Sequence, residues 1–132
     1  MIQGIGHIGI VVKNIEESLA AVSKALDLPI PPIQDVPEKK MKVAMVELKG
    51  IGLEFLEDYS KEGELARLVN EKGDAIHHFC VLTDDMEADI KSLEKRGIEM
   101  ADREPRIGLR GKRIAFTKAS ALNGIPMELS EP

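Results

Sequence analysis

The chain has 132 residues, of which 43% are hydrophobic and 31% charged, a composition typical of one folded domain and not of a disordered chain. Its formal net charge is −5 and its aromatic residues are three Phe and one Tyr, so neither the basic surface nor the stacking platform of a nucleic-acid-binding protein is expected. The single cysteine, Cys80, excludes an internal disulfide and a cysteine-rich zinc module.

The sequence also bears on location. The first residues lack a basic stretch followed by a long apolar run, so no signal peptide is expected. No apolar run approaches the roughly 20 residues that span a bilayer, so no membrane segment is expected. A lone thiol fits a reducing compartment, and we therefore expect a cytoplasmic protein.

The first half of the chain predicts a strand, a helix and three further strands. The apolar, β-branched run 5–12 is typical of a strand. Asn14 is a candidate N-cap for a helix that ends before Pro29. Further strands are expected around Ile33, over 42–48 and over 52–56, the last two joined by the turn Lys49-Gly50.

The second half repeats this order after a short helix. The expected elements are a helix over 64–72 ended by Gly73, a strand over 76–83, a helix capped by Asp84 or Asp85 that runs to Arg96, a short strand over 98–100, a loop over 103–112, and strands over 113–118 and 125–129. The order β-α-β-β-β therefore occurs twice. We expect one domain over 1–132, with one module over about 1–60, a linker helix over about 61–74 and a second module over about 75–132.

The repeat places the same two residue types at equivalent positions. His7 and His78 fall on the first strand of each half, and Glu54 and Glu128 fall on the last. Taken singly, a strand histidine is more often structural and a strand glutamate more often solvated. A carboxylate within an apolar strand is costly unless it is exposed, paired or bound to a metal ion, and here the pattern recurs. The four residues are therefore candidate ligands of a divalent first-row ion, whose identity the ligand types do not decide.

These residues carry a resemblance to a known family. The motifs are 7–12, 36–38, 53–57, 77–81, 104–108, 111–116 and 124–129. The chain resembles the vicinal-oxygen-chelate superfamily (glyoxalase, bleomycin resistance and dioxygenase proteins), and within it most closely the methylmalonyl-CoA epimerases. The stretch from Pro105 to Phe116, with its spaced glycines, favours the epimerases over glyoxalase I.

The resemblance implies an α+β fold in which two βαβββ modules form a half-open, mostly antiparallel, barrel-like sheet of eight strands with helices on its convex face. It implies metal ligation by His7, Glu54, His78 and Glu128, with Co²⁺, Ni²⁺, Mn²⁺ or Zn²⁺ as the ion, and a homodimer. Of the histidine doublet, His78 is chosen because Gly6-His7 matches His77-His78; His77 is expected to face away and to be structural.

The implied reaction is epimerisation of a short branched acyl-CoA through proton abstraction at C2 and a metal-stabilised enolate. Glu128 is the candidate for one catalytic base. The third strand has Val43 where some epimerases carry a glutamate, so Glu47, on the same face by alternation, is the candidate for the second base, although a solvated carboxylate is its commoner role. Candidate contacts for the CoA phosphates are Lys39, Lys40, Arg110, Lys112 and Arg113.

Two other functions remain open at this point. A glyoxalase I-like lactoylglutathione lyase would use the same ligand set and the same proton-shuttling logic. A small-molecule-binding protein without catalysis would need no such set of ligands. In each case the expected partner is a small-molecule substrate or ligand, and neither nucleic acid nor a membrane.

Overall fold

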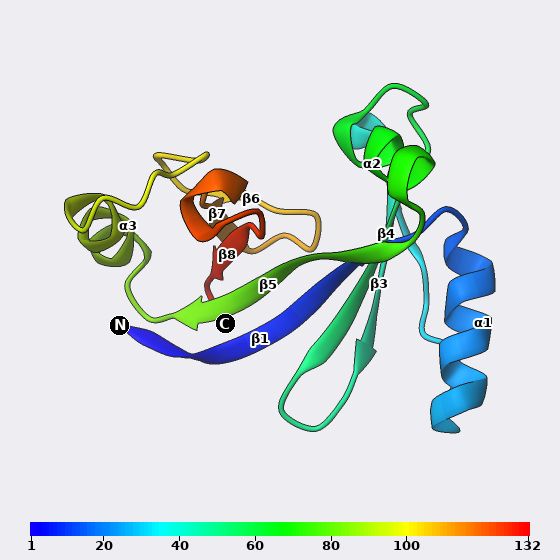
Figure 1. The fold of residues 1–132 in the computed structure, drawn as a ribbon. Helices are drawn as coiled ribbons and strands as arrows, with labels where there is room; N and C mark the ends of the chain where they lie inside the picture. Colours follow the sequence, from blue (N-terminus) through cyan, green and yellow to red (C-terminus); the bar gives the residue numbers. More distant parts are fainter. The chain divides into compact units, whose positions relative to one another are not determined.

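The computed structural model describes all 132 residues as an α+β protein (Figure 1). Its elements are β1 (Ile2–Val11), α1 (Ile15–Leu26), β2 (Gln34–Val36), the 3-10 helix η1 (Pro37–Lys39), β3 (Met41–Glu47), β4 (Gly52–Asp58), α2 (Glu64–Lys72), β5 (Ala75–Thr83), α3 (Met86–Lys95), β6 (Arg106–Ile107), β7 (Arg113–Phe116), the 3-10 helix η2 (Ala119–Leu122) and β8 (Met127–Ser130). The strands form a mixed eight-stranded sheet in the order β2-β3-β4-β1-β5-β8-β7-β6. None of the helices has the length and apolar character that crossing a membrane requires.

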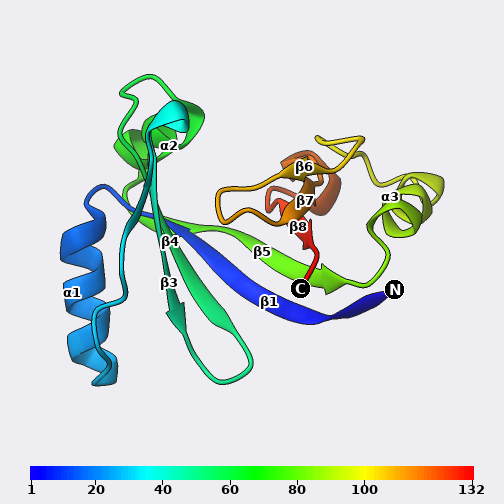
Figure 2. The ribbon, with the colours of Figure 1, turned by 180° about the vertical axis from the view of Figure 1, so that it is seen from behind.

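The contacts divide the chain into two compact units. We call Met1–Ile8 together with His77–Pro132 the C-terminal unit, and Gly9–Ile76 the N-terminal unit. The start of β1 therefore belongs with the second half of the chain. In both views β1 runs beside β5 (Figures 1 and 2).

In the C-terminal unit, β5 and β8 are parallel neighbours, with Cys80 opposite Glu128. The pairs β7–β8 and β6–β7 are antiparallel. Parallel strands cannot be joined by a tight turn, and α3 with the β6–β7 hairpin forms the long connection between β5 and β8.

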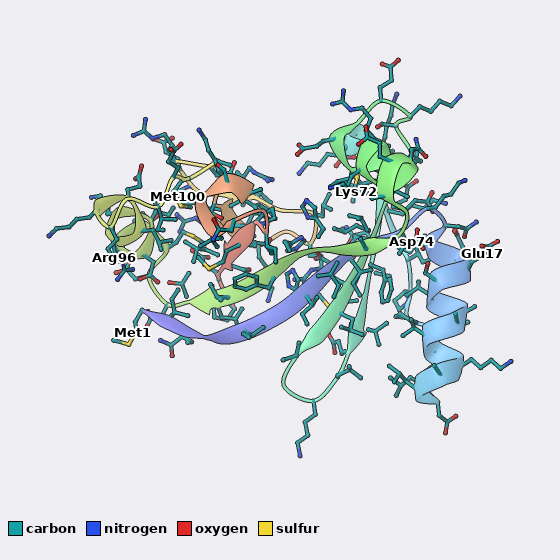
Figure 3. The ribbon with its side chains drawn as sticks, viewed as in Figure 1. Met1, Glu17, Lys72, Asp74, Arg96 and Met100 are labelled. Carbon is teal, nitrogen blue, oxygen red and sulfur yellow. The ribbon has the colours of Figure 1, made fainter.

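An apolar core holds α3 against this sheet. Asp85 is the N-cap of α3 and accepts a hydrogen bond from the Ala88 backbone N–H at 3.2 Å. The core residues are Val81, Met86, Ile90, Met100, Ala115 and Leu129. Met100, labelled in Figure 3, follows α3 and pairs with Thr117 through an isolated bridge.

The N-terminal unit packs α1 on the β3–β4 hairpin. Asn14 caps α1 by accepting from the Glu17 backbone N–H at 3.0 Å, and the helix ends at Asp27 in the left-handed conformation. The core residues are Val12, Ile15, Leu19, Ala44, Val46 and Phe55. The hairpin is antiparallel, and it sets Glu54 opposite Met45.

Helix α2 begins without a side chain on its own N-cap, Gly63. Asp58, at the end of β4, serves instead, because its Oδ2 accepts from the Ala66 backbone N–H at 3.1 Å. Burial raises the pKa of Asp58, but the hydrogen bonds from Ser60, Ala66 and Leu65 outweigh burial and the net pKa is lowered. A Cβ on Gly63 would lie 2.2 Å from Asp58 Oδ2, so this arrangement requires glycine there.

The structure confirms the α+β fold and the order of helices expected from the sequence, and α2 has the predicted bounds. Some strand ends move, since β1 begins at Ile2, β2 covers Gln34–Val36 and β8 covers Met127–Ser130. Three larger details also differ. The strand expected over 98–100 is reduced to the bridge at Met100, and the loop expected over 103–112 contains β6. The sheet is mixed, since β5 and β8 are parallel. Each difference depends on which strand pairs with which, and single-residue β propensities do not encode that pairing.

Candidate metal centre

Three of the four predicted ligands meet in the C-terminal unit. His7 is on β1, His78 on β5 and Glu128 on β8, and their exposed fractions are 2%, 2% and 6%. Cys80 lies opposite Glu128, and because alternate residues of a strand share a face, His78 projects on the same side as both. Strand register therefore brings the imidazole and the carboxylate together.

The three ligand atoms are spaced as the ligands of one ion would be. His7 Nε2 lies 2.9 Å from Glu128 Oε1, His78 Nε2 lies 3.3 Å from that oxygen, and the two Nε2 atoms are 3.3 Å apart. Two ligand atoms each about 2.1 Å from an ion are about 3.0 Å apart at a right angle and about 3.4 Å apart at the tetrahedral angle. The donor set thus fits a divalent ion.

Glu128 Oε1 is buried, and His7 Nε2 and His78 Nε2 lie within 3.3 Å of it. Three potential ligand atoms thus converge at one buried point, where a cation can replace the protons that lie between them. Burial alone would raise the pKa of Glu128, but His7 and His78 lower it to about 2, so the carboxylate is ionised at neutral pH.

The outer ring nitrogen of His78, the Nδ1 that is not part of the converging set, faces another histidine. His77 Nδ1 lies 2.9 Å from His78 Nδ1, and the rings meet edge to face with centroids 5.1 Å apart. Desolvation and the neighbouring His78 lower the pKa of His77 to about 4, so His77 is neutral at pH 7 and has one nitrogen that accepts a hydrogen bond. The sequence predicted that His77 faces away from the site and is structural, whereas its Nδ1 contacts the ring of the candidate ligand His78.

The outer nitrogen of His7 faces an arginine. Arg110 Nη2, from the β6–β7 turn, lies 3.2 Å from His7 Nδ1. The sequence makes Arg110 and Arg113 candidate contacts for CoA phosphates. The structure pairs Arg113 with Glu87 and Glu131. The glycines on either side of Arg110 indicate a tight turn, but they do not indicate what the side chain reaches.

Apolar groups surround the histidines. Phe116 meets His78 edge to face with a centroid distance of 5.1 Å, and Cys80, two residues after His78, is fully buried. A Cβ on Gly6 would lie 2.8 Å from Leu82 Cδ2. A larger residue before His7 would therefore require the Leu82 side chain to shift.

The remaining candidates are in the N-terminal unit. Glu54 is buried on β4, 6% exposed, between Leu53 and Phe55. Of the four predicted ligands, Glu54 is the one that belongs to the N-terminal unit, and it is buried like the other three. Glu47, the candidate second base, is the last residue of β3 and is exposed.

Comparison with known proteins agrees with this fold and this donor set. The sequence matches the glyoxalase/bleomycin resistance protein/dioxygenase superfamily over residues 6–116. The chain belongs to this superfamily. The matched region begins within β1 and ends with the last residue of β7.

Relatives within the superfamily are similar along nearly the whole chain. The uncharacterized protein YqjC of Bacillus subtilis is 30% identical over 126 residues, which cover 96% of this chain and 90% of YqjC. The ethylmalonyl-CoA/methylmalonyl-CoA epimerase of Cereibacter sphaeroides is 28% identical over 134 residues, covering 99% of each. Streptomyces coelicolor methylmalonyl-CoA epimerase, solved in complex with 2-nitronate-propionyl-CoA, superposes with a TM-score of 0.90 over 99% of this chain and 98% of that one. At 23% identity, that last likeness shows the fold.

Proposed function

We propose that this protein is an isomerase that epimerises methylmalonyl-CoA, or a similar short branched acyl-CoA, with a divalent metal ion. The observation that carries the proposal is the convergence of His7 Nε2, His78 Nε2 and Glu128 Oε1 within 2.9 to 3.3 Å of one another. The superfamily includes a relative named as an epimerase of this substrate, similar over the full length of the chain.

In this proposal His7, His78 and Glu128 hold the ion, and Glu54 is the fourth ligand. Glu54 has the support of its burial and of its equivalence to Glu128 in the repeat. Nitrogen and oxygen donors together suit Co²⁺, Ni²⁺, Mn²⁺ or Zn²⁺. The ion supplies a Lewis acid for the negative charge that develops on the thioester oxygen as the C2 proton leaves.

The two glutamates divide the proton transfers. Glu128 is ionised at neutral pH and buried, so on dissociating from the ion it can take the C2 proton on one face of the substrate away from bulk water. Glu47 returns a proton to the other face, and its exposure at the end of β3 lets it exchange protons with solvent. The homodimer implied by the resemblance stays a prediction, which light scattering tests.

Deuterium uptake at C2 of methylmalonyl-CoA in D₂O, followed by NMR, tests the proposal. Protein stripped of metal and then restored with Co²⁺ is expected to exchange rapidly only after restoration. Glu128→Gln should lose the exchange, whereas the matched control Glu131→Gln, three residues along and paired with Arg113, should keep it. Absence of exchange with bound metal would overturn the substrate assignment and direct attention to hemithioacetal isomerisation.

A non-catalytic binder predicts a different result. The substitution His78→Ala should abolish metal retention and turnover in an epimerase or a glyoxalase I-like enzyme. It should leave ligand binding largely intact in a protein that only binds small molecules.

A further inference from the structure

The turn between β6 and β7 directs one arginine at the candidate metal centre. Gly111 N–H donates to the Gly108 carbonyl at 3.0 Å, and Gly108 N–H donates to the Lys112 carbonyl at 2.8 Å. Gly111 has a φ of +83°, and a Cβ on Gly108 would lie 2.8 Å from Ile114 Cδ1. Both glycines therefore serve a tight turn, from which the Arg110 side chain reaches the buried His7.

The contact between Arg110 and His7 decides where the histidine carries its proton. A guanidinium has five N–H donors and no acceptor, so His7 Nδ1 must accept the hydrogen bond. A neutral imidazole with an accepting Nδ1 has its proton on Nε2. That Nε2 is the atom 2.9 Å from Glu128 Oε1 and 3.3 Å from His78 Nε2.

This proton position is the wrong one for binding a metal ion. Coordination uses a nitrogen lone pair, so a neutral His7 that binds through Nε2 carries its proton on Nδ1. An Nδ1–H and an Arg110 N–H cannot donate to each other. The contact with Arg110 and coordination through Nε2 therefore exclude one another.

His78 shows the opposite arrangement. Its outer nitrogen meets His77 Nδ1, and an imidazole can either donate or accept there. His78 can thus move its proton to Nδ1 and keep its neighbour. Of the two histidines, only His7 must lose its partner at Nδ1 when an ion binds. That partner is Arg110, whose guanidinium is permanently charged.

We propose that Arg110 exchanges partners, from His7 Nδ1 in the metal-free protein to the free carboxylate of the acyl-CoA substrate in the loaded protein, and so selects malonyl-type thioesters. This inference rests on the proposed function. The two carboxylates proposed as ligands, Glu54 and Glu128, neutralise a divalent ion. The Arg110 guanidinium then gives the centre one net positive charge, which the single negative charge of the acyl group balances. Guanidinium and carboxylate form a two-pronged pair that a neutral acyl chain cannot replace.

Zn²⁺ affinity is the first test, because it does not depend on turnover. Arg110→Met removes the competing donor and is expected to bind Zn²⁺ about tenfold more tightly than the wild type in chelator competition. Lys112→Met removes one positive charge from the same exposed turn and controls for the loss of charge. Equal affinities for the two variants would overturn the exchange of partners.

The proton position on His7 is measured directly by ring ¹⁵N NMR of the metal-free wild-type protein, with the signals assigned by their loss in His7→Gln. Protonation of Nε2 is expected in the wild type, and that preference should be lost in Arg110→Met. A proton on His7 Nδ1 in the metal-free wild type contradicts the inference even if the variant does not fold.

Binding of malonate to the Zn²⁺-loaded protein tests the second partner. Arg110→Met should bind malonate at least about tenfold more weakly than wild type, whereas Lys112→Met should bind it like wild type. Equal malonate affinity in all three would overturn the carboxylate role. If C2 exchange fails while the Zn²⁺, NMR and malonate results hold, the proposed function is wrong and Arg110 still exchanges partners. If exchange occurs and these results fail, only the role of Arg110 is wrong.

Discussion

His7 and His78 occupy equivalent positions in the two halves of the chain, yet their outer nitrogens meet opposite partners. His78 has His77 at 2.9 Å, a ring that can accept a hydrogen bond, whereas His7 has Arg110 at 3.2 Å, a group that can only donate. At the position before His7 stands Gly6, close against Leu82, so the support comes from a distant turn. A repeat can thus duplicate candidate ligands without duplicating what orients them.

The largest expected effect tests whether the two histidines are equal as ligands. His7→Ala and His78→Ala should each lower Zn²⁺ affinity about 100-fold or more, because each removes a donor from a closely spaced set. Chelator competition measures both. A His7 variant with wild-type affinity would show that only the second half of the repeat binds the ion.

The support of His78 gives the next largest effect. His77→Phe should lower Zn²⁺ affinity about tenfold, because a phenyl ring cannot accept the His78 Nδ1 proton. His77→Gln is the matched variant, since its amide oxygen can accept, and it should stay near wild type. Zn²⁺ affinity is thus expected to fall in His77→Phe and to rise in Arg110→Met. If the affinity changed in the same direction in both variants, His77 and Arg110 would not act as opposite partners.

Asp58 supports α2 in the first half, and the second half has no matching helix. Asp58→Ala should cost about 2 kcal/mol of unfolding free energy, because charge-assisted hydrogen bonds to Ser60 and Ala66 are lost. The folded pKa of Asp58 is lowered, so its contribution is complete above the unfolded carboxyl pKa of about 4 and is lost as pH falls through the folded value.

Urea unfolding at pH 7, 5 and 3 measures this dependence. The difference between wild type and Asp58→Ala should be undiminished at pH 7 and smaller at pH 3. The exposed neighbour Glu62 provides the control Glu62→Gln, which should unfold like the wild type. A difference that is independent of pH would mean that the charge of Asp58 does not support α2.

The smallest expected effect concerns a feature that the two halves share. Asn14 and Asp85 cap the helices α1 and α3, and each accepts from the backbone N–H three residues on, at 3.0 and 3.2 Å. Asn14→Ala and Asp85→Ala should each cost about 1 kcal/mol in thermal or urea unfolding. Clearly unequal costs would show that the halves also differ in their local helix signals.

The sequence predicted the helices well because their boundaries are local. Asn14 caps α1 and Gly73 follows α2 as expected, and both act on residues within one helical turn. The two-residue strand β6 was missed because it exists only through pairing with β7, and its residues Arg106 and Ile107 are exposed. Nothing in its own residues distinguishes it from a loop.

For the candidate site, the repeat identified His7, His78 and Glu128, and the structure brings these three together. The contacts of His77 and Arg110 were not predicted. His77 is next to His78 on one strand, where alternation predicts opposite faces, and Arg110 lies over 100 positions from His7, so no sequence pattern links the two. Glu54 as a ligand and Glu47 as a base stay predictions.

Local patterning was sufficient for the helix boundaries and for the repeated His and Glu positions, because capping and strand alternation act over a few residues, and the family resemblance supplied the fold class. The tertiary structure decided which groups touch the outer nitrogens of those ligands. The approach of Glu128 to His78 depends on the register of β5 with β8, and the approach of Arg110 to His7 depends on where the β6–β7 turn reaches. Both arise from contacts between residues far apart in sequence.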